Sequence, residues 1–187
     1  MSTRAIIRIA RAFAQIIDAK SPWTYRHSER VAEIAVGIGD VLGLRPAERH
    51  DLERAALLHD IGKLGVSNLI LDKADRLTDE EFEAVRRHPG YTFEILSFVA
   101  PFRALAASAA AHHEKLDGSG YHRGMAGDEI DTVARILAVA DIFEALSARR
   151  PYREPLETGA ALDRMRPEAG AKLCAEAFRA LETSAES

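Results

Sequence analysis

Cysteine and long hydrophobic runs are both scarce in this sequence. Its single cysteine, Cys174, cannot form an internal disulfide or a thiolate metal site, which fits a reducing compartment, so we interpret it as a small core residue. No apolar stretch approaches the roughly 20 residues of a membrane helix, and arginines interrupt the start where a signal peptide would need an apolar core. We therefore expect a cytoplasmic protein with no membrane span.

An excess of charge of either sign is also missing. The 25 basic and 29 acidic residues are interspersed and give a formal net charge of −4. Because no basic stripe is present, the sequence argues against duplex nucleic acid as a partner, and an anionic substrate would need a local positive site. With 187 residues, 47% of them hydrophobic, the chain is long enough to bury one sizeable core.

Alternating strand patterns are absent, and helical periodicity dominates. Apolar residues three and four positions apart predict helices over 4–19, 26–42, 47–60, 78–88, 90–98, 101–113 and 132–147. The predicted fold is all-α, a compact single-domain helical bundle over 1–187 with its core at about 12–181 and a frayed tail at 182–187. Residues 115–131 hold four of the 12 glycines and form a long irregular stretch, which we expect to border the active site.

Histidine is the residue type that stands out. Of the seven histidines, five lie at or near predicted helix ends: His27, His59, His88, His112 and His113. A lone histidine on a helix is usually a surface or core residue, as we interpret His50 and His122. Five together, with Asp60 adjoining His59, form the ligand set of borderline divalent metals. The pattern therefore predicts a metal site between helices.

Two further details support a metal site. Asp141 lies inside an apolar run, where a buried carboxylate needs a partner such as a metal. His112 and His113 are adjacent, so on one helix their side chains would diverge by about 100°. They would have to reach the metal from a helix end or a distorted turn. Asp60 is suited to bridge two cations, and together these residues predict a metal hydrolase.

Three segments closely resemble the signatures of the HD-GYP family, in the same order and spacing. They are residues 59–63, 112–121 and 141–153, and the wider resemblance runs from about Ala12 to a predicted helix at 175–181. The resemblance implies a helical HD-superfamily domain with a dinuclear or trinuclear iron or manganese centre. It also implies an enzyme, a phosphodiesterase that hydrolyses cyclic di-GMP, or a close cyclic dinucleotide relative, to linear pGpG or GMP.

The resemblance also implies roles for individual residues. The family's metal-ligand positions are filled here by His59, Asp60, His88, His112, His113 and Asp141, with Asp60 bridging. Lys63 matches a lysine near the reacting phosphate, so Asp60 and Lys63 are the expected catalytic residues. Tyr121, Arg150 and Arg153 match substrate contacts, and the arginines would provide the local positive charge. A water shared by two cations would lose a proton and attack phosphorus in line with the leaving 3′ oxygen.

Two positions depart from the family pattern. The first is Trp23, four residues before His27, at a position where family members that resemble one another in having a trinuclear centre carry a glutamate. An indole cannot ligate a metal. We therefore expect a dinuclear transition-metal centre, with iron ahead of manganese, and His27 either as an added ligand or as support for the two ions. His122 replaces the proline of the Gly-Tyr-Pro triplet, which removes a ring that would stiffen the loop.

Other functions fit the same residues. A related HD-domain nucleotide hydrolase or diiron oxygenase would keep the metal ligands, and a non-catalytic cyclic dinucleotide sensor or interaction module would bind without turnover. The Gly-Tyr loop and the segment 150–153 favour the phosphodiesterase, and Asp60 and Lys63 argue against the sensor, whereas His122 keeps it open. Since no receiver or sensor domain is recognisable in the sequence, a separate regulatory protein partner is expected.

Overall fold

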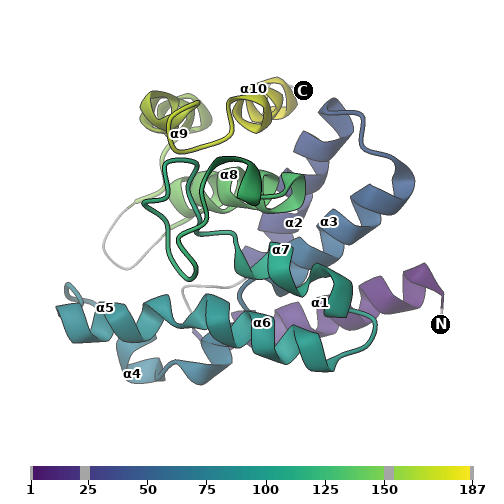
Figure 1. Cartoon of the computed structure of the whole chain (residues 1–187). Helices are drawn as coiled ribbons and strands as arrows, with labels where there is room; N and C mark the ends of the chain where they lie inside the picture. Colours follow the sequence, from purple (N-terminus) through teal and green to yellow (C-terminus); the bar gives the residue numbers. More distant parts are fainter. Residues whose placement is uncertain (1, 22–25, 150–153, 186–187) are drawn as a thin grey trace.

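The computed structural model describes residues 2–21, 26–149 and 154–185, and within these ranges it contains helices and no β-strand (Figure 1). The all-α prediction is confirmed. The longer helices are α1 (Thr3–Asp18), α2 (His27–Val41), α3 (Pro46–Leu58), α5 (Asp79–Arg86), α6 (His88–Phe98), α8 (Thr132–Ser147), α9 (Thr158–Met165) and α10 (Ala175–Ala185). Shorter helical segments are η2 (Ile61–Gly65), α4 (Asn68–Leu71), η3 (Arg103–Leu105), α7 (Ala106–Ala110), η4 (Gly127–Glu129) and η5 (Arg166–Glu168).

Side-chain caps explain where several helices begin. The Ser2 hydroxyl accepts a hydrogen bond from the backbone of Ala5 at the start of α1, and Asp131 does the same for Ala134 at the start of α8. Thr78 and Glu81, three residues apart in the sequence, form a capping box at the start of α5. Each cap satisfies a backbone N–H that has no partner within the helix.

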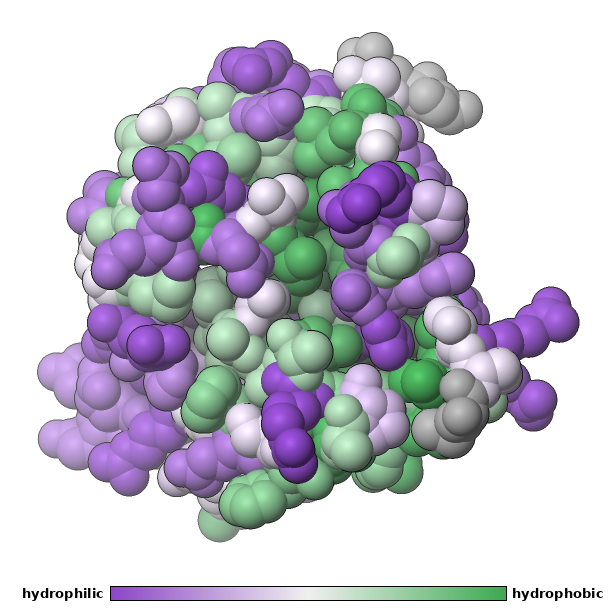
Figure 2. Space-filling model, turned by 45° about the vertical axis from the view of Figure 1, so that its right-hand side comes forward, coloured by the Kyte–Doolittle hydropathy of each residue, from purple (hydrophilic) through white to green (hydrophobic). Residues whose placement is uncertain are grey.

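The core lies where α2 packs against α3 and α8, with α1 and α10 closing its sides. Leu52, Leu137 and Leu181 are among its buried side chains, and α1, α2 and α3 each contribute fully buried alanines. Small side chains let helix axes approach closely, so larger residues from neighbouring helices fill the space between them. Hydrophilic residues cover much of the face shown in Figure 2, with hydrophobic ones visible between them.

The structure departs from the predicted helices in several places. The predicted helix over 101–113 is the short pair η3 and α7 followed by a turn, because a run of alanines satisfies helical periodicity without fixing where the helix ends. The break predicted between helices 78–88 and 90–98 is present, but α5 ends at Arg86 and α6 already begins at His88. Pro89 lies in the first turn of α6, where its missing N–H costs nothing. Helix α9 was not predicted. The expected frayed tail is instead helical to Ala185, and Glu182 pairs with Arg166.

Candidate metal centre

The predicted metal ligands come from the ends of four helices and the middle of a fifth. His27 and His88 are the first residues of α2 and α6, while His59 directly follows α3. The adjacent pair His112 and His113 lies in the turn after α7, which confirms that the pair does not share a helix face. Asp141 projects from within α8. These positions converge because the helix ends meet beside α8.

The Asp60 carboxylate lies between two sets of imidazoles. Its Oδ1 atom is 3.3 Å from Nε2 of His88 and 3.9 Å from Nε2 of His112. Its Oδ2 atom is 3.4 Å from Nε2 of His27 and 3.5 Å from Nε2 of His59. The side chain is 3% exposed. Each carboxylate oxygen therefore faces a different pair of nitrogens, as a bridging ligand requires.

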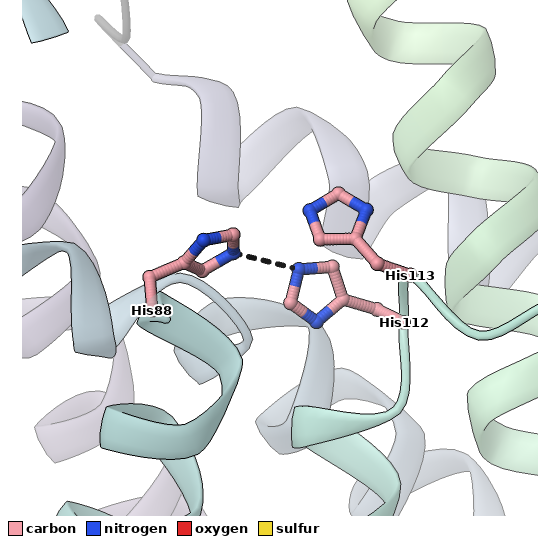
Figure 3. A group of neighbouring side chains, drawn as sticks. All are labelled: His88, His112 and His113. Carbon is pink, nitrogen blue, oxygen red and sulfur yellow. Dashed lines mark hydrogen bonds between the residues drawn. The ribbon is translucent and has the colours of Figure 1, made fainter. Parts of the chain in front are cut away.

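The remaining ligand atoms complete two clusters around this carboxylate. His27, His59 and Asp141 place one ligand atom each within 4.8 Å of one another, and so do His88, His112 and His113. Figure 3 shows the second cluster, whose three rings from two segments of the chain lie around a shared space. The structure thus brings together all seven residues that the sequence predicts as ligands.

Hydrogen bonds to main-chain carbonyls fix the orientation of three of these rings. Nδ1 of His59, His88 and His112 donates to the carbonyl oxygen three residues earlier, at 2.6, 2.7 and 2.7 Å. This bond holds the proton on Nδ1 and leaves the Nε2 lone pair directed into the centre. The Nε2 atoms of His88 and His112, 3.2 Å apart, therefore need a proton or a cation between them.

The buried donor set fits a divalent cation. His59 Nε2 and Asp60 Oδ1 are buried, and neither has a hydrogen-bond partner among the residues that the structure describes. Although His88 Nε2 lies near Asp60 Oδ1, it has no hydrogen to donate when Nδ1 donates to Val85. Such unpaired buried atoms are costly, and a cation coordinated by imidazole nitrogen and carboxylate oxygen would satisfy both.

Burial and neighbouring charges set the protonation states of His112, His113 and Asp60. Burial lowers the pKa of His112 well below the usual range and that of His113 to about 3, so both imidazoles are neutral. Burial opposes ionisation of Asp60, but the Lys63 ammonium and the surrounding imidazoles hold its pKa well below the usual range. Neutral imidazole and ionised carboxylate are the forms that bind metals.

Lys63 is held beside Asp60 by the short η2 helix. Its ammonium lies 2.5 Å from Asp60 Oδ2, and its side chain is 21% exposed. Residues three apart eclipse one another on a 3₁₀ helix, so the sequence His-Asp-Ile-Gly-Lys places the cation over the carboxylate. Lys63 is therefore one of the few parts of the centre that solvent reaches.

Hydrogen bonds of Gly62 and Thr92 join η2 to α6. The sequence alone did not reveal this contact. The Gly62 N–H donates to Thr92 Oγ1 at 3.0 Å, and the Thr92 hydroxyl donates to the His59 carbonyl at 2.8 Å. A Cβ atom on Gly62 would overlap the His88 carbonyl oxygen. The glycine between the Asp60 and Lys63 positions was the available clue to this close approach.

The irregular stretch at residues 115–131 borders the centre, as predicted. The centroids of the Tyr121 and His113 rings are 4.6 Å apart. The guanidinium of Arg86, at the end of α5, lies 4.9 Å from the centroid of the Tyr121 ring. Glu114, which the sequence analysis overlooked, is buried and accepts hydrogen bonds from the backbone of Arg123 at 2.7 Å and of Met125 at 3.0 Å. This carboxylate anchors the loop that carries Tyr121.

Comparison with known proteins identifies the family. A family model described as the HD domain matches residues 11–175. The chain belongs to the HD domain family. A 3′3′-cGAMP-specific phosphodiesterase of Vibrio cholerae is 52% identical over 174 residues, which cover 93% of this chain and 38% of that protein. A cyclic di-GMP phosphodiesterase response regulator of Xanthomonas campestris is 39% identical over 83% of this chain and 40% of its own length.

A solved structure agrees with this assignment. The crystal structure of a cyclic GMP-AMP-specific phosphodiesterase of Vibrio cholerae matches with 44% identity and a TM-score of 0.63, covering all of this chain and 42% of that one. This HD domain thus spans about two fifths of the length of these relatives. The predicted resemblance to HD-GYP proteins is confirmed, and membership of the family implies a divalent metal site.

The two departures from the family pattern have different outcomes. His122 is exposed with φ at +103°, a conformation that a proline ring cannot adopt, so the backbone of the loop itself differs at this position. Trp23, on which the expectation of two ions rests, lies outside the described residues, as do Arg150 and Arg153.

Neither His50 nor His122 belongs to the two clusters. Cys174 is half-buried and packs against the core.

Glu144 is another group that the sequence alone did not single out. It lies one turn after Asp141 on the same face of α8, which was the available clue. His27 Nδ1 donates to its Oε2 atom at 2.5 Å, and Arg30 Nε donates to Oε1 at 2.7 Å. Among the five clustered histidines, His27 is therefore oriented by a buried carboxylate, which directs its Nε2 atom toward Asp60.

We expect Glu144→Gln to weaken metal binding while the HD domain remains folded. Glutamine offers one acceptor oxygen for two donors, so the bond to His27 or to Arg30 is lost. Loss of a carboxylate that orients a ligand typically lowers metal affinity by about 10–100-fold. Competition with a chelator measures the affinity, and Glu176→Gln on the exposed face of α10 is the control. Equal affinities for the two variants would contradict the assigned role of Glu144.

Among the residues that the structure describes, none of the helices is long and apolar enough to span a bilayer.

Proposed function

We propose that this HD domain is a metal-dependent cyclic dinucleotide phosphodiesterase with a dinuclear transition-metal centre. The observation that carries the proposal is the position of the Asp60 carboxylate, with one oxygen facing each cluster of imidazoles and Lys63 beside it. The names of the relatives support it, because proteins 52% and 39% identical to this chain are named as cyclic dinucleotide phosphodiesterases.

The two clusters define which residues would hold each ion. One ion would be held by His27, His59 and Asp141, the other by His88, His112 and His113, with Asp60 shared. Two divalent ions would offset the charge of the scissile phosphate and activate a water for attack. Iron is proposed ahead of manganese, although imidazole and carboxylate ligands accept both metals. His27 is therefore proposed as a ligand of the first ion.

The protein side chains have distinct parts in the proposed reaction. The Lys63 ammonium would stabilise the negative charge that develops on the phosphate during attack. Tyr121 borders the rim formed by His113, whose side chain is 26% exposed, and is proposed as a substrate contact. Arg150 and Arg153 are proposed as further substrate contacts. The expected product is the linear dinucleotide, and a slow second cleavage to mononucleotides is the proposed consequence of holding two ions.

Two further proposals concern where the enzyme acts and what controls it. We expect the enzyme to act in the cytoplasm and to be controlled by a separate regulatory protein partner. The substrate class is the cyclic dinucleotides, since relatives are named for 3′3′-cGAMP and for cyclic di-GMP.

Incubation of the metal-loaded protein with both cyclic dinucleotides tests this function. Protein prepared anaerobically and loaded with Fe²⁺ or Mn²⁺ is expected to convert at least one of them to a linear dinucleotide, which chromatography separates from the substrate. Protein that binds a cyclic dinucleotide but leaves it intact would instead be a sensor. Oxygen uptake without hydrolysis would identify an oxygenase, and turnover of nucleotides alone would identify a nucleotide hydrolase.

A further inference from the structure

A cleft of about 740 Å³ opens from the candidate metal centre along α5. Asp60 and Lys63 form part of its lining, and so do the end of α1 and the segment from Ile70 to Val85. Clefts that hold small ligands have volumes of about 300–1,000 Å³. The cleft is therefore large enough for a ligand that extends well beyond a single phosphate placed at Asp60 and Lys63.

The cations of this cleft divide into paired and unpaired ones. Lys63 pairs with Asp60 at 2.5 Å, and Lys73 pairs with Glu81 at 2.6 Å. Arg76 and Lys20 also line the cleft, and within the described part of the chain neither has a carboxylate at ion-pair distance. An unpaired guanidinium presents donors that match a phosphate group.

The acidic residues of the cleft do not occupy these cations. Asp18 accepts hydrogen bonds from the Ser28 backbone at 3.1 Å and hydroxyl at 2.8 Å, which directs it toward α2. Asp75 and Asp79 also line the cleft, but both are exposed and neither pairs with Arg76. Arg76 thus remains available to an anion that enters the cleft.

Phe82 adds an aromatic surface to the same wall. It lies on the face of α5 that lines the cleft, and it is 48% exposed. Val85, one turn further along the same face, is half-buried. A half-exposed phenyl ring in a cleft is a surface on which a nucleobase can stack, and stacking of this kind accepts any base. Arg76 and Phe82 therefore combine a phosphate donor with a base platform.

We propose that the outer part of this cleft is the subsite for the second nucleotide of a cyclic dinucleotide, with Arg76 and Lys20 on its phosphate and Phe82 against its base. This inference rests on the proposed function. A cyclic dinucleotide carries its two phosphates on opposite sides of one ring, so a molecule with one phosphate at Asp60 and Lys63 must place the other at a distance from the metals. The cleft provides an unpaired cation for it.

The test compares a large and a small substrate in Arg76→Ala and Phe82→Ala. Bis(p-nitrophenyl) phosphate carries a single phosphate and cannot reach a second subsite while it reacts. We expect the KM for the cyclic dinucleotide to rise by about tenfold more than the KM for this small diester in each variant, with metal content retained. Arg164→Ala, an exposed arginine on α9 outside the cleft, is the matched control and should leave both constants unchanged.

The outcomes separate the subsite from the proposed function. If the unchanged protein cleaves cyclic dinucleotides and both variants show equal changes for the two substrates, the subsite is wrong and the function stands. If no cyclic dinucleotide is cleaved, fluorescence anisotropy with labelled cyclic di-GMP decides. Weaker binding to Arg76→Ala and Phe82→Ala than to Arg164→Ala would support the subsite, and equal binding to all three would overturn it.

Discussion

Asp60→Ala is expected to abolish metal loading and phosphodiester hydrolysis together. Each carboxylate oxygen of Asp60 faces a different cluster of imidazoles, so a single substitution removes a ligand from both proposed ions. Elemental analysis of anaerobically prepared protein, together with the hydrolysis assay, measures both losses. Folding should survive at least in part, because Lys63, the cation left without its partner, is partly exposed to solvent.

The control for this substitution is Asp51→Ala. Asp51 lies on α3, is exposed, and pairs with Arg54 outside the centre. The Asp51 side chain is 55% exposed and Arg54 keeps its hydrogen bond to the His50 carbonyl, so stability, metal content and activity should stay close to those of the unchanged protein. An Asp60→Ala protein that still loads two metal ions per chain would contradict the bridging role.

Gly62→Ala is expected to destabilise the domain and to lower its metal content. A Cβ at this position would overlap the His88 carbonyl oxygen and lie 2.5 Å from the Thr92 backbone nitrogen. Backbone atoms cannot turn aside as a flexible side chain can, so η2 must move away from α6. Overpacking of this kind costs about 1–3 kcal/mol and occasionally more. The shift would also separate Asp60 from His88, which weakens metal binding.

Urea unfolding and metal analysis measure both effects, with Gly159→Ala as the matched control. Gly159 lies on α9, and among the described residues no atom beyond its chain neighbours and the backbone of its own helix lies within 4 Å of where its Cβ would be. Because alanine favours helix by about 1 kcal/mol over glycine, the control should be equally stable or more stable. Equal free energies of unfolding for the two variants would show that the contact between η2 and α6 is not tight.

The ligand set could be predicted from the sequence because ligand chemistry belongs to residue types. Imidazoles and carboxylates clustered near helix ends indicate a metal, whatever the path of the chain between them. The sequence did not reveal the second layer of the centre. Glu144 orients His27 across 117 positions of the chain, and Thr92 reaches the His59 carbonyl across 33. The one-turn spacing of Glu144 from Asp141 and the glycine at position 62 were the local clues, but neither indicates which distant residue the polar side chain meets.

The sequence by itself determined that this protein is helical and that its histidines and aspartates are metal-type ligands. It also determined where capped helices begin, such as α5 after Thr78. These properties follow from periodicity and local hydrogen bonding, which neighbouring residues settle among themselves. Only the tertiary structure decided that Asp60 faces two clusters, that Gly62 must lack a side chain, and that Arg76 and Phe82 share a cleft with Lys63. The reason is physical: such contacts join residues whose separation depends on how the whole chain packs.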